Sequence, residues 1–104
     1  MKDTSKMDAA GVARACSRAL KAAGWSIYKR ARRNDRGTPG LHCYRVGYSN
    51  KVAVTYMSAN PYEAYSKRRQ DERRELVRRA KDALREKGYP VADDGYIHCR
   101  KSRY

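Results

Sequence analysis

Small apolar side chains recur every three or four residues from position 9 to position 23 of the chain. This spacing predicts an amphipathic helix that buries one face. Ser5 and Asp8 come just before the stretch as a candidate capping pair. Gly24 follows it, as glycine commonly does at the end of a helix.

The same spacing returns later and predicts a longer helix over 60–87. Asn60 as cap and Pro61 at the first helical position favour a start there, and Gly88 favours a stop. The run KRRQDERR at 67–74 interrupts the apolar stripe. We therefore expect this part of the helix to lie over solvent or a ligand and not over the core.

Apolar and polar residues alternate in three stretches between the helices, which predicts strands over 25–33, 41–49 and 51–57. After the second helix, residues 88–104 are predicted to form a hairpin and tail, with Asp94-Gly95 in the turn. The predicted fold class is α+β. Its order is helix, three-stranded antiparallel sheet, long helix and C-terminal β-hairpin.

The length of 104 residues limits the chain to a single domain, 1–104, in which we expect residues 1–6 to be disordered. Leu, Ile and Val together number only twelve, and Phe is absent, which is a small apolar stock for a net charge of +14. Nine Tyr and one Trp offset the shortage, because each ring buries a large area. We expect a thin core.

Two short segments are alike: GLHCYR begins at Gly40 and GYIHCR begins at Gly95. When Gly24 is aligned with Gly88, the helix stripes before them and the strands after them also match. An internal α-β-β duplication explains this match. So does the alternative that two unrelated segments share glycine caps and apolar spacing, and the sequence leaves both open.

The repeated His-Cys pair raises the question of a metal or catalytic site. Neighbouring strand residues point to opposite faces, so Cys43 and Cys99 would face the core while His42 and His98 point the other way. A four-ligand zinc site would need a broken strand, and the sequence has no close-spaced C-x-x-C ligands. We therefore expect no metal and no cofactor, and we interpret the cysteines as small buried hydrophobes.

Three cysteines at unrelated spacings argue against a disulfide framework and for a reducing compartment. The N-terminus lacks the apolar segment of a signal peptide, and no apolar run is long enough to span a membrane. These features predict a cytoplasmic protein with no membrane partner.

The positive charge is concentrated in the first half of the chain. Ten basic residues and one acid lie between 14 and 54, whereas thirteen basic residues between 55 and 104 are accompanied by eight acids. A large net positive charge favours binding to polyanions. Nucleic acid is therefore the expected partner, with an acidic protein as the alternative.

One side of the predicted sheet combines aromatic rings with cations. Unpaired bases stack on such rings, and guanidinium groups pair with phosphates, which indicates a nucleic-acid-binding face. The alternative is that a helix or a second subunit covers this face. The predicted nucleic-acid-binding residues are Tyr28, Arg30, Arg32, Arg33, Arg36, His42, Tyr44, Lys67, Arg68, Arg69, Tyr96, His98 and Arg100.

The order helix, three antiparallel strands, helix resembles the double-stranded RNA-binding domain and the related HicA-type mRNA interferase toxins. The Gly24-Trp25 step after the first helix and His42 at the start of the second strand carry the resemblance, which covers positions 12–84. It implies RNA binding and, for His42, a role as general base or acid in RNA cleavage.

The chain departs from both families at several points. Leu41 precedes His42 where the toxins have Gly-Ser-His, and the basic cluster of the RNA-binding domain is displaced to 67–69. The tail from Gly88 onward has no counterpart. The role carried over is therefore that of His42 alone.

The leading hypothesis is a small intracellular protein, of phage or bacterial type, that binds RNA or DNA mainly through the backbone. A second hypothesis is a toxin-type endoribonuclease using His42, the one catalytic candidate; no Ser-His-Asp set, carboxylate pair or glycine-rich phosphate loop stands out in the sequence. A third is a phage-type inhibitor or adaptor that docks on an acidic host protein. The sequence does not distinguish a monomer from a homodimer.

Overall fold

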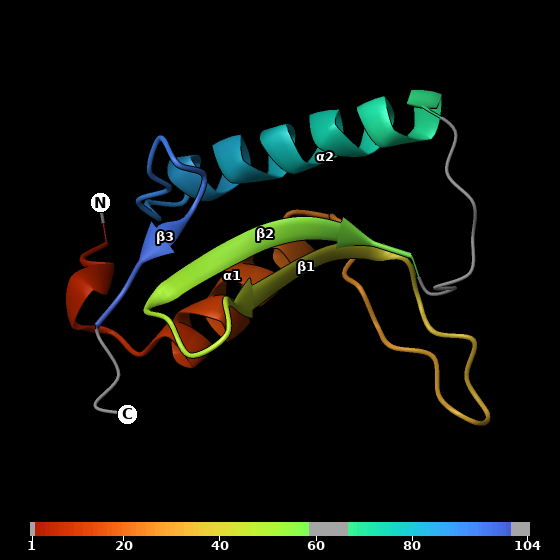
Figure 1. Cartoon of the computed structure of the whole chain (residues 1–104), viewed down its shortest axis with the longest axis horizontal. Helices are drawn as coiled ribbons and strands as arrows, with labels where there is room; N and C mark the ends of the chain where they lie inside the picture. The colour runs from red at the N-terminus through yellow and green to blue at the C-terminus, as the bar shows by residue number, and fades with distance from the viewer. Residues whose placement is uncertain (1, 59–66, 101–104) are drawn as a thin grey trace.

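The computed structural model describes residues 2–58 and 67–100 (Figure 1). The elements are a short 3-10 helix η1 (Thr4–Lys6), α1 (Ala9–Ala22), β1 (Gly40–Arg45), β2 (Lys51–Met57), α2 (Lys67–Glu86) and β3 (Ile97–His98). The strands form one antiparallel sheet in the order β1-β2-β3. The predicted α+β class, with two helices and a three-stranded antiparallel sheet, is confirmed. No helix within the described ranges is long and apolar enough to cross a membrane.

Both helices pack against the same face of the sheet. In Figure 1, α1 crosses behind the strands and α2 runs along their upper side. The two helices and the strands contribute to one core of buried side chains. The largest fully buried members are Leu20, Leu41, Leu84, Ile97, Val52 and Cys16. The many alanines in the helix stripes keep the layers close and the core thin.

The two long helices end in the same way. Gly24 and Gly88 adopt positive φ angles of 93° and 95°. One residue later, the N–H groups of Trp25 and Tyr89 each donate to a leucine carbonyl five residues back, both at 3.0 Å. This is the Schellman arrangement, in which glycine has no steric penalty.

The chain after each helix pairs differently in the two candidate repeats. Ile27 makes an isolated bridge to Leu41 with the hydrogen-bond pattern of parallel strands, whereas Val91 makes an antiparallel bridge to Ile97. The repeat thus holds closely at the helix ends and less closely in the strands. Duplication and shared capping both remain compatible with it.

The segments that form the sheet differ from the predicted ones. Segment 25–33, for which alternation predicts a strand, makes only isolated bridges, and the third strand of the sheet is β3 from the C-terminal region. The C-terminal hairpin forms in part: β3 has two residues, and the Val91 bridge with the Ala92 N–H donating to the Tyr96 carbonyl at 2.9 Å closes its turn.

The N-terminal residues dock onto the C-terminal strand. Thr4, in the stretch 1–6 that we expected to be disordered, is buried, and its hydroxyl donates to the His98 carbonyl at 2.8 Å. The expected Ser5–Asp8 capping pair does not form, because the Ser5 hydroxyl donates to Asp3 and Asp8 makes no side-chain capping bond. The predicted start of the second helix at Asn60-Pro61 lies outside the described residues.

Gly40 lies where two backbone segments meet. The Leu41 N–H donates to the Ser26 carbonyl at 2.9 Å, and the Tyr28 N–H donates to the Leu41 carbonyl at 2.9 Å. The Ser26 hydroxyl adds a bond to the Pro39 carbonyl at 2.8 Å. A Cβ atom at Gly40 would overlap the Ser26 carbonyl oxygen. Only glycine allows this approach without moving the backbone.

Replacing Gly40 by Ala should lower the free energy of unfolding by about 1–3 kcal/mol, because the added methyl group forces the two segments apart. Gly11→Ala is the matched control, since a Cβ there meets open space inside α1, and it should stabilise the fold by about 0.5–1 kcal/mol. Urea unfolding of both variants measures the difference. Equal effects of the two substitutions would contradict the close approach at Gly40.

Candidate nucleic-acid interface

The sheet face turned away from the helices carries the rings of β1. Leu41 and Cys43 are buried in the core, so the alternating residues His42 and Tyr44 point to the opposite side. His42 is half-buried, and Tyr44 is 36% exposed. His42 and Cys43 therefore lie on opposite faces of the sheet, as the sequence predicts.

Three rings form a contiguous row, which we call the ring row: Tyr28, His42 and Tyr44. The Tyr28 and His42 ring centroids are 5.2 Å apart in an edge-to-face arrangement. The His42 and Tyr44 centroids are 5.1 Å apart with an interplanar angle of 13°, so these rings are stacked. Contacts between rings of this kind stabilise one orientation of the side chains, in addition to the stabilisation that burial provides. The ring row is thus a preformed aromatic surface.

The imidazole of His42 is neutral near pH 7. Burial between the neighbouring rings lowers the pKa of His42 below its ordinary value, because the charged form loses hydration there. Neither ring nitrogen forms a hydrogen bond to any residue in the described ranges. A neutral imidazole with both nitrogens available can bond to a sugar hydroxyl or accept a proton.

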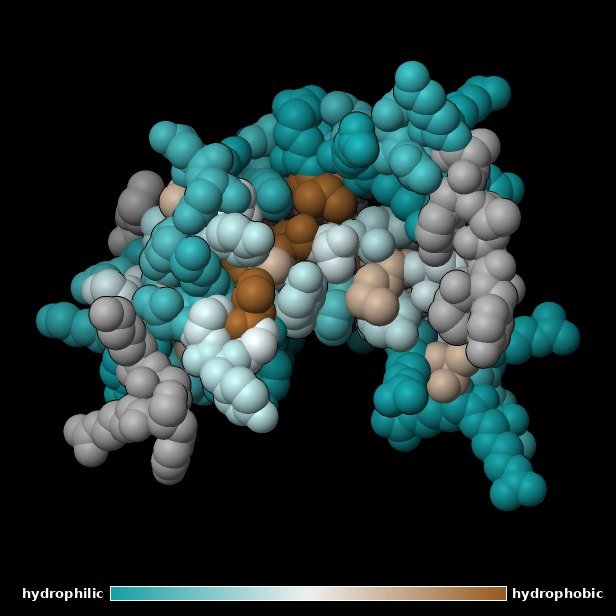
Figure 2. Space-filling view, in the orientation of Figure 1, coloured by the Kyte–Doolittle hydropathy of each residue, from teal (hydrophilic) through white to brown (hydrophobic). Residues whose placement is uncertain are grey.

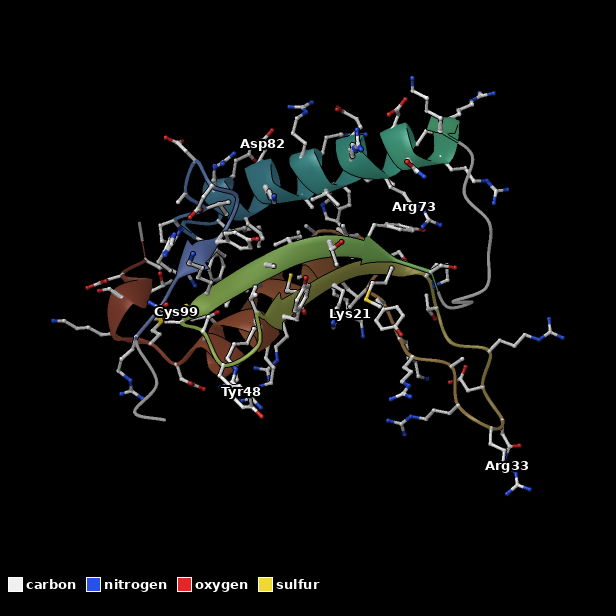
Figure 3. The ribbon with its side chains drawn as sticks, in the orientation of Figure 1. Lys21, Arg33, Tyr48, Arg73, Asp82 and Cys99 are labelled. Carbon is white, nitrogen blue, oxygen red and sulfur yellow. The ribbon has the colours of Figure 1, made fainter. Side chains whose placement is uncertain are left out.

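An arginine-rich hairpin leads into β1. Bridges between Lys29 and Thr38 and between Arg32 and Asp35 define it, and Arg33 lies at its tip, far from the helices (Figure 3). We call residues 29–38 the arginine hairpin. It contains five basic residues and one acid.

The single acid of the arginine hairpin is already engaged. Asp35 pairs with the Lys29 ammonium at 2.6 Å and accepts the Gly37 N–H at 2.9 Å. The hydrogen bond from Lys29 lowers the pKa of the Asp35 carboxyl below its ordinary value. Arg30, Arg33 and Arg36 are exposed, and none of them forms an ion pair with a residue that the structure describes.

The cations of α2 are in a different situation. Arg78 pairs with Glu75 at 2.5 Å and with Asp82 at 3.3 Å, and Arg85 also pairs with Asp82. Arg68, one of the predicted binding residues, pairs with Glu72 at 3.4 Å. Spacings of three and four residues bring these opposite charges together on the helix surface. Much of the charge on α2 is therefore neutralised locally.

The predicted binding residues fall into separate groups. Tyr28, His42 and Tyr44 form the ring row, and the four arginines at 30, 32, 33 and 36 lie on the arginine hairpin beside it. Lys67, Arg68 and Arg69 lie on the first turn of α2, on the helix side of the sheet. The predicted face is thus divided between distant parts of the molecule.

The C-terminal members form a further group at the β3 edge. His98 contacts the Asp94 carboxylate at 2.8 Å, and the Lys51 ammonium lies 5.4 Å from the centre of the Tyr96 ring. The Arg100 N–H donates to the Met7 carbonyl at 2.9 Å. The His98 and Tyr96 side chains thus have partners of their own, whereas the contact of Arg100 is made by its backbone and its side chain is exposed.

Tyr48 was missed by the sequence reasoning. It lies in the turn between β1 and β2, the residue is 86% exposed, and the Arg45 guanidinium is 5.9 Å from the ring centre. Arg33 and Tyr48 lie at opposite ends of the sheet in Figure 3, and Figure 2 shows the surface hollowed between these ends. An aromatic residue in a polar Gly-Tyr-Ser-Asn turn was the available signal, since such a turn has no core in which to bury it.

The thiols are poorly suited to metal binding or nucleophilic chemistry. Burial raises the pKa of Cys16 to about 12 and that of Cys43 to about 11, so both remain protonated at neutral pH. Among the described residues, no three His, Cys, Asp or Glu side chains are grouped so that they could hold a metal ion.

Comparison of the chain with protein-family models, with curated proteins and with solved structures finds no match. The resemblance to RNA-binding domains and interferase toxins therefore stays a prediction from the Gly24-Trp25 step and His42. The observed order of elements departs from it, because two strands lie between the helices and the third strand of the sheet follows α2.

The burial of His42 has a consequence that NMR can measure. Its pKa should lie below 6.5, and Tyr44→Ala should raise it, because removal of the stacked ring hydrates the imidazolium. The lowered folded-state pKa also means that this group's contribution to stability is lost as pH falls below about 6.5. Titration of the His42 Cε1 proton gives the pKa directly. A value at or above 6.5, unchanged by Tyr44→Ala, would contradict the described packing.

Proposed function

We propose that the protein binds nucleic acid through the arginine hairpin and the adjoining open face of the sheet. The observation that carries this proposal is the pairing of three exposed arginines, without acidic partners in the described chain, with a preformed ring row on a face that the helices leave uncovered. The arginine hairpin would contact phosphates, and the ring row would contact sugars and bases.

The charge distribution supports this division of roles. Arg30, Arg33 and Arg36 keep their full charge for an external anion, whereas several α2 arginines would first have to break an existing ion pair. Guanidinium groups pair with phosphates through two parallel hydrogen bonds. Each phosphate that is neutralised releases condensed counterions, so affinity should fall steeply as salt rises.

Endoribonuclease activity remains a second proposal, favoured by the position of one group. His42 is neutral and has no hydrogen-bond partner in the described chain, and β1 follows directly from the arginine hairpin. A neutral imidazole beside positive charge suits abstraction of a 2′-hydroxyl proton near a phosphate.

Incubation of RNA with purified protein tests the nuclease proposal. Cleavage should be lost in His42→Ala, whereas binding through the arginine hairpin should persist. Cleavage at the same rate in this variant would exclude His42 from the reaction, and intact RNA with the unaltered protein would exclude the activity itself.

The binding proposal predicts a result for the triple variant Arg30→Ala, Arg33→Ala and Arg36→Ala. Its affinity for a labelled oligonucleotide should fall by at least about tenfold, because three charge-assisted contacts to phosphates are lost. The slope of log affinity against log salt should become shallower by about 2. Each phosphate contact on a single strand contributes about 0.7 to this slope, and three contacts are lost. Fluorescence anisotropy at several salt concentrations measures both quantities.

A second triple variant with the same loss of charge provides the control. Arg14, Arg18 and Lys21 are exposed on α1, and their replacement by Ala removes three cations from another surface. This control should lose much less affinity and keep its salt slope. If the two variants lose the same affinity, binding depends on net charge alone and the assigned surface is wrong. Failure of the unaltered protein to bind nucleic acid near 0.15 M salt would favour an acidic protein as partner.

A further inference from the structure

We propose that the ligand is a single strand, and that its unpaired bases stack on Tyr44, at the exposed end of the ring row, and on Tyr48. This inference rests on the proposed function and specifies its ligand. It assigns Tyr48, with Arg45, as the far end of the binding track.

The ring row favours a single strand for a geometric reason. In a duplex the faces of the bases are covered by their stacked neighbours, so a duplex offers phosphates, sugars and groove edges to a protein. A single strand offers base faces, and these stack on aromatic side chains with little dependence on sequence. The arginine hairpin could contact either ligand, but the exposed rings of Tyr44 and Tyr48 can stack on the bases of a single strand alone.

The path of the track follows from the chain order. The arginine hairpin ends immediately before β1, His42 and Tyr44 point outward from β1, and the turn with Tyr48 follows β1 directly. The six residues of β1 span about 20 Å at a rise of about 3.3 Å per residue. That length accommodates about six stacked nucleotides at about 3.4 Å each, and fewer in an extended strand.

Tyr48 has the properties of a binding residue and not of a packing residue. The residue is 86% exposed, and the nearby Arg45 guanidinium, 5.9 Å from the ring centre, restricts the ring by a cation–π contact. Tyr48 and Arg45 thus repeat, at one end of β1, the combination of ring and cation found at the other end.

A second copy of the chain is a poorer occupant of this face than a polyanion. Each copy has a net charge of +14, so two such faces would bring unpaired cations together. A nucleic-acid strand instead supplies negative charge along its whole length. Charge complementarity therefore favours a nucleic-acid strand over a second copy of the chain as the ligand of this face.

The test compares single-stranded and duplex ligands on variants that remove rings but keep apolar volume. Labelled oligo-dT and oligo-U of about 12 nucleotides and a duplex of about 12 base pairs serve as probes. Tyr44→Leu and Tyr48→Leu should each weaken single-strand binding about 5- to 100-fold, and should change duplex binding less than about twofold. Tyr96→Leu at the β3 edge is the matched control and should leave both affinities unchanged. Tighter binding of oligo-U than of oligo-dT would identify RNA as the source of the strand.

The outcomes separate this inference from the proposed function. Equal weakening of single-strand and duplex binding by the ring variants, or no weakening at all, would overturn the single-strand track. If the arginine-hairpin variant still loses affinity in that case, nucleic-acid binding stands without the track. If the arginine-hairpin variant also binds normally, both proposals fail. Circular dichroism verifies that each variant is folded. Analytical sedimentation tests self-association: if the unaltered protein is a dimer and Tyr44→Leu is a monomer, the ring row is a dimer interface and not a strand-binding site.

Discussion

The close approach of the Ser26–Tyr28 backbone to β1 at Gly40 is the constraint on which the site depends. Two backbone hydrogen bonds of 2.9 Å hold Leu41 between Ser26 and Tyr28. They place the Tyr28 ring 5.2 Å from His42, which starts the ring row. They also close the base of the segment between them, so residues 29–38 leave the sheet as a projecting hairpin. One local contact thereby sets the position of both the rings and the arginines.

The separation of charge from the core explains how so basic a chain can fold around few large apolar residues. Both helices cover one face of the sheet, and α2 neutralises part of its charge through pairs such as Arg78 with Glu75 and Asp82. The arginine hairpin instead projects into solvent, where repulsion between its guanidinium groups is screened. A bound polyanion would stabilise the folded state further by mass action, since it binds the assembled face and not its separated parts.

Local patterns allowed much of the fold to be predicted from the sequence. The ends of both long helices at Gly24 and Gly88, the paired strands β1 and β2, and the opposite faces of His42 and Cys43 follow from spacing and turn chemistry. The contribution of β3 to the sheet could not be predicted in this way, because it depends on pairing between residues nearly fifty positions apart. The docking of Thr4 on the His98 carbonyl, across 94 positions, was equally out of reach. For the same reason Tyr96 and His98 were predicted to share one binding face with Tyr28, His42 and Tyr44, although β2 lies between β1 and β3 in the sheet.

NMR mapping of the bound strand can show whether nucleic acid lies on the arginine hairpin and the open face of the sheet. A single-stranded oligonucleotide is added to ¹⁵N-labelled protein, and the backbone shift changes are recorded residue by residue. The largest changes should fall on the arginine hairpin, on β1 and on the turn with Tyr48, with the second half of α2 nearly unchanged. Largest changes on α1 or α2, with β1 unaffected, would contradict it.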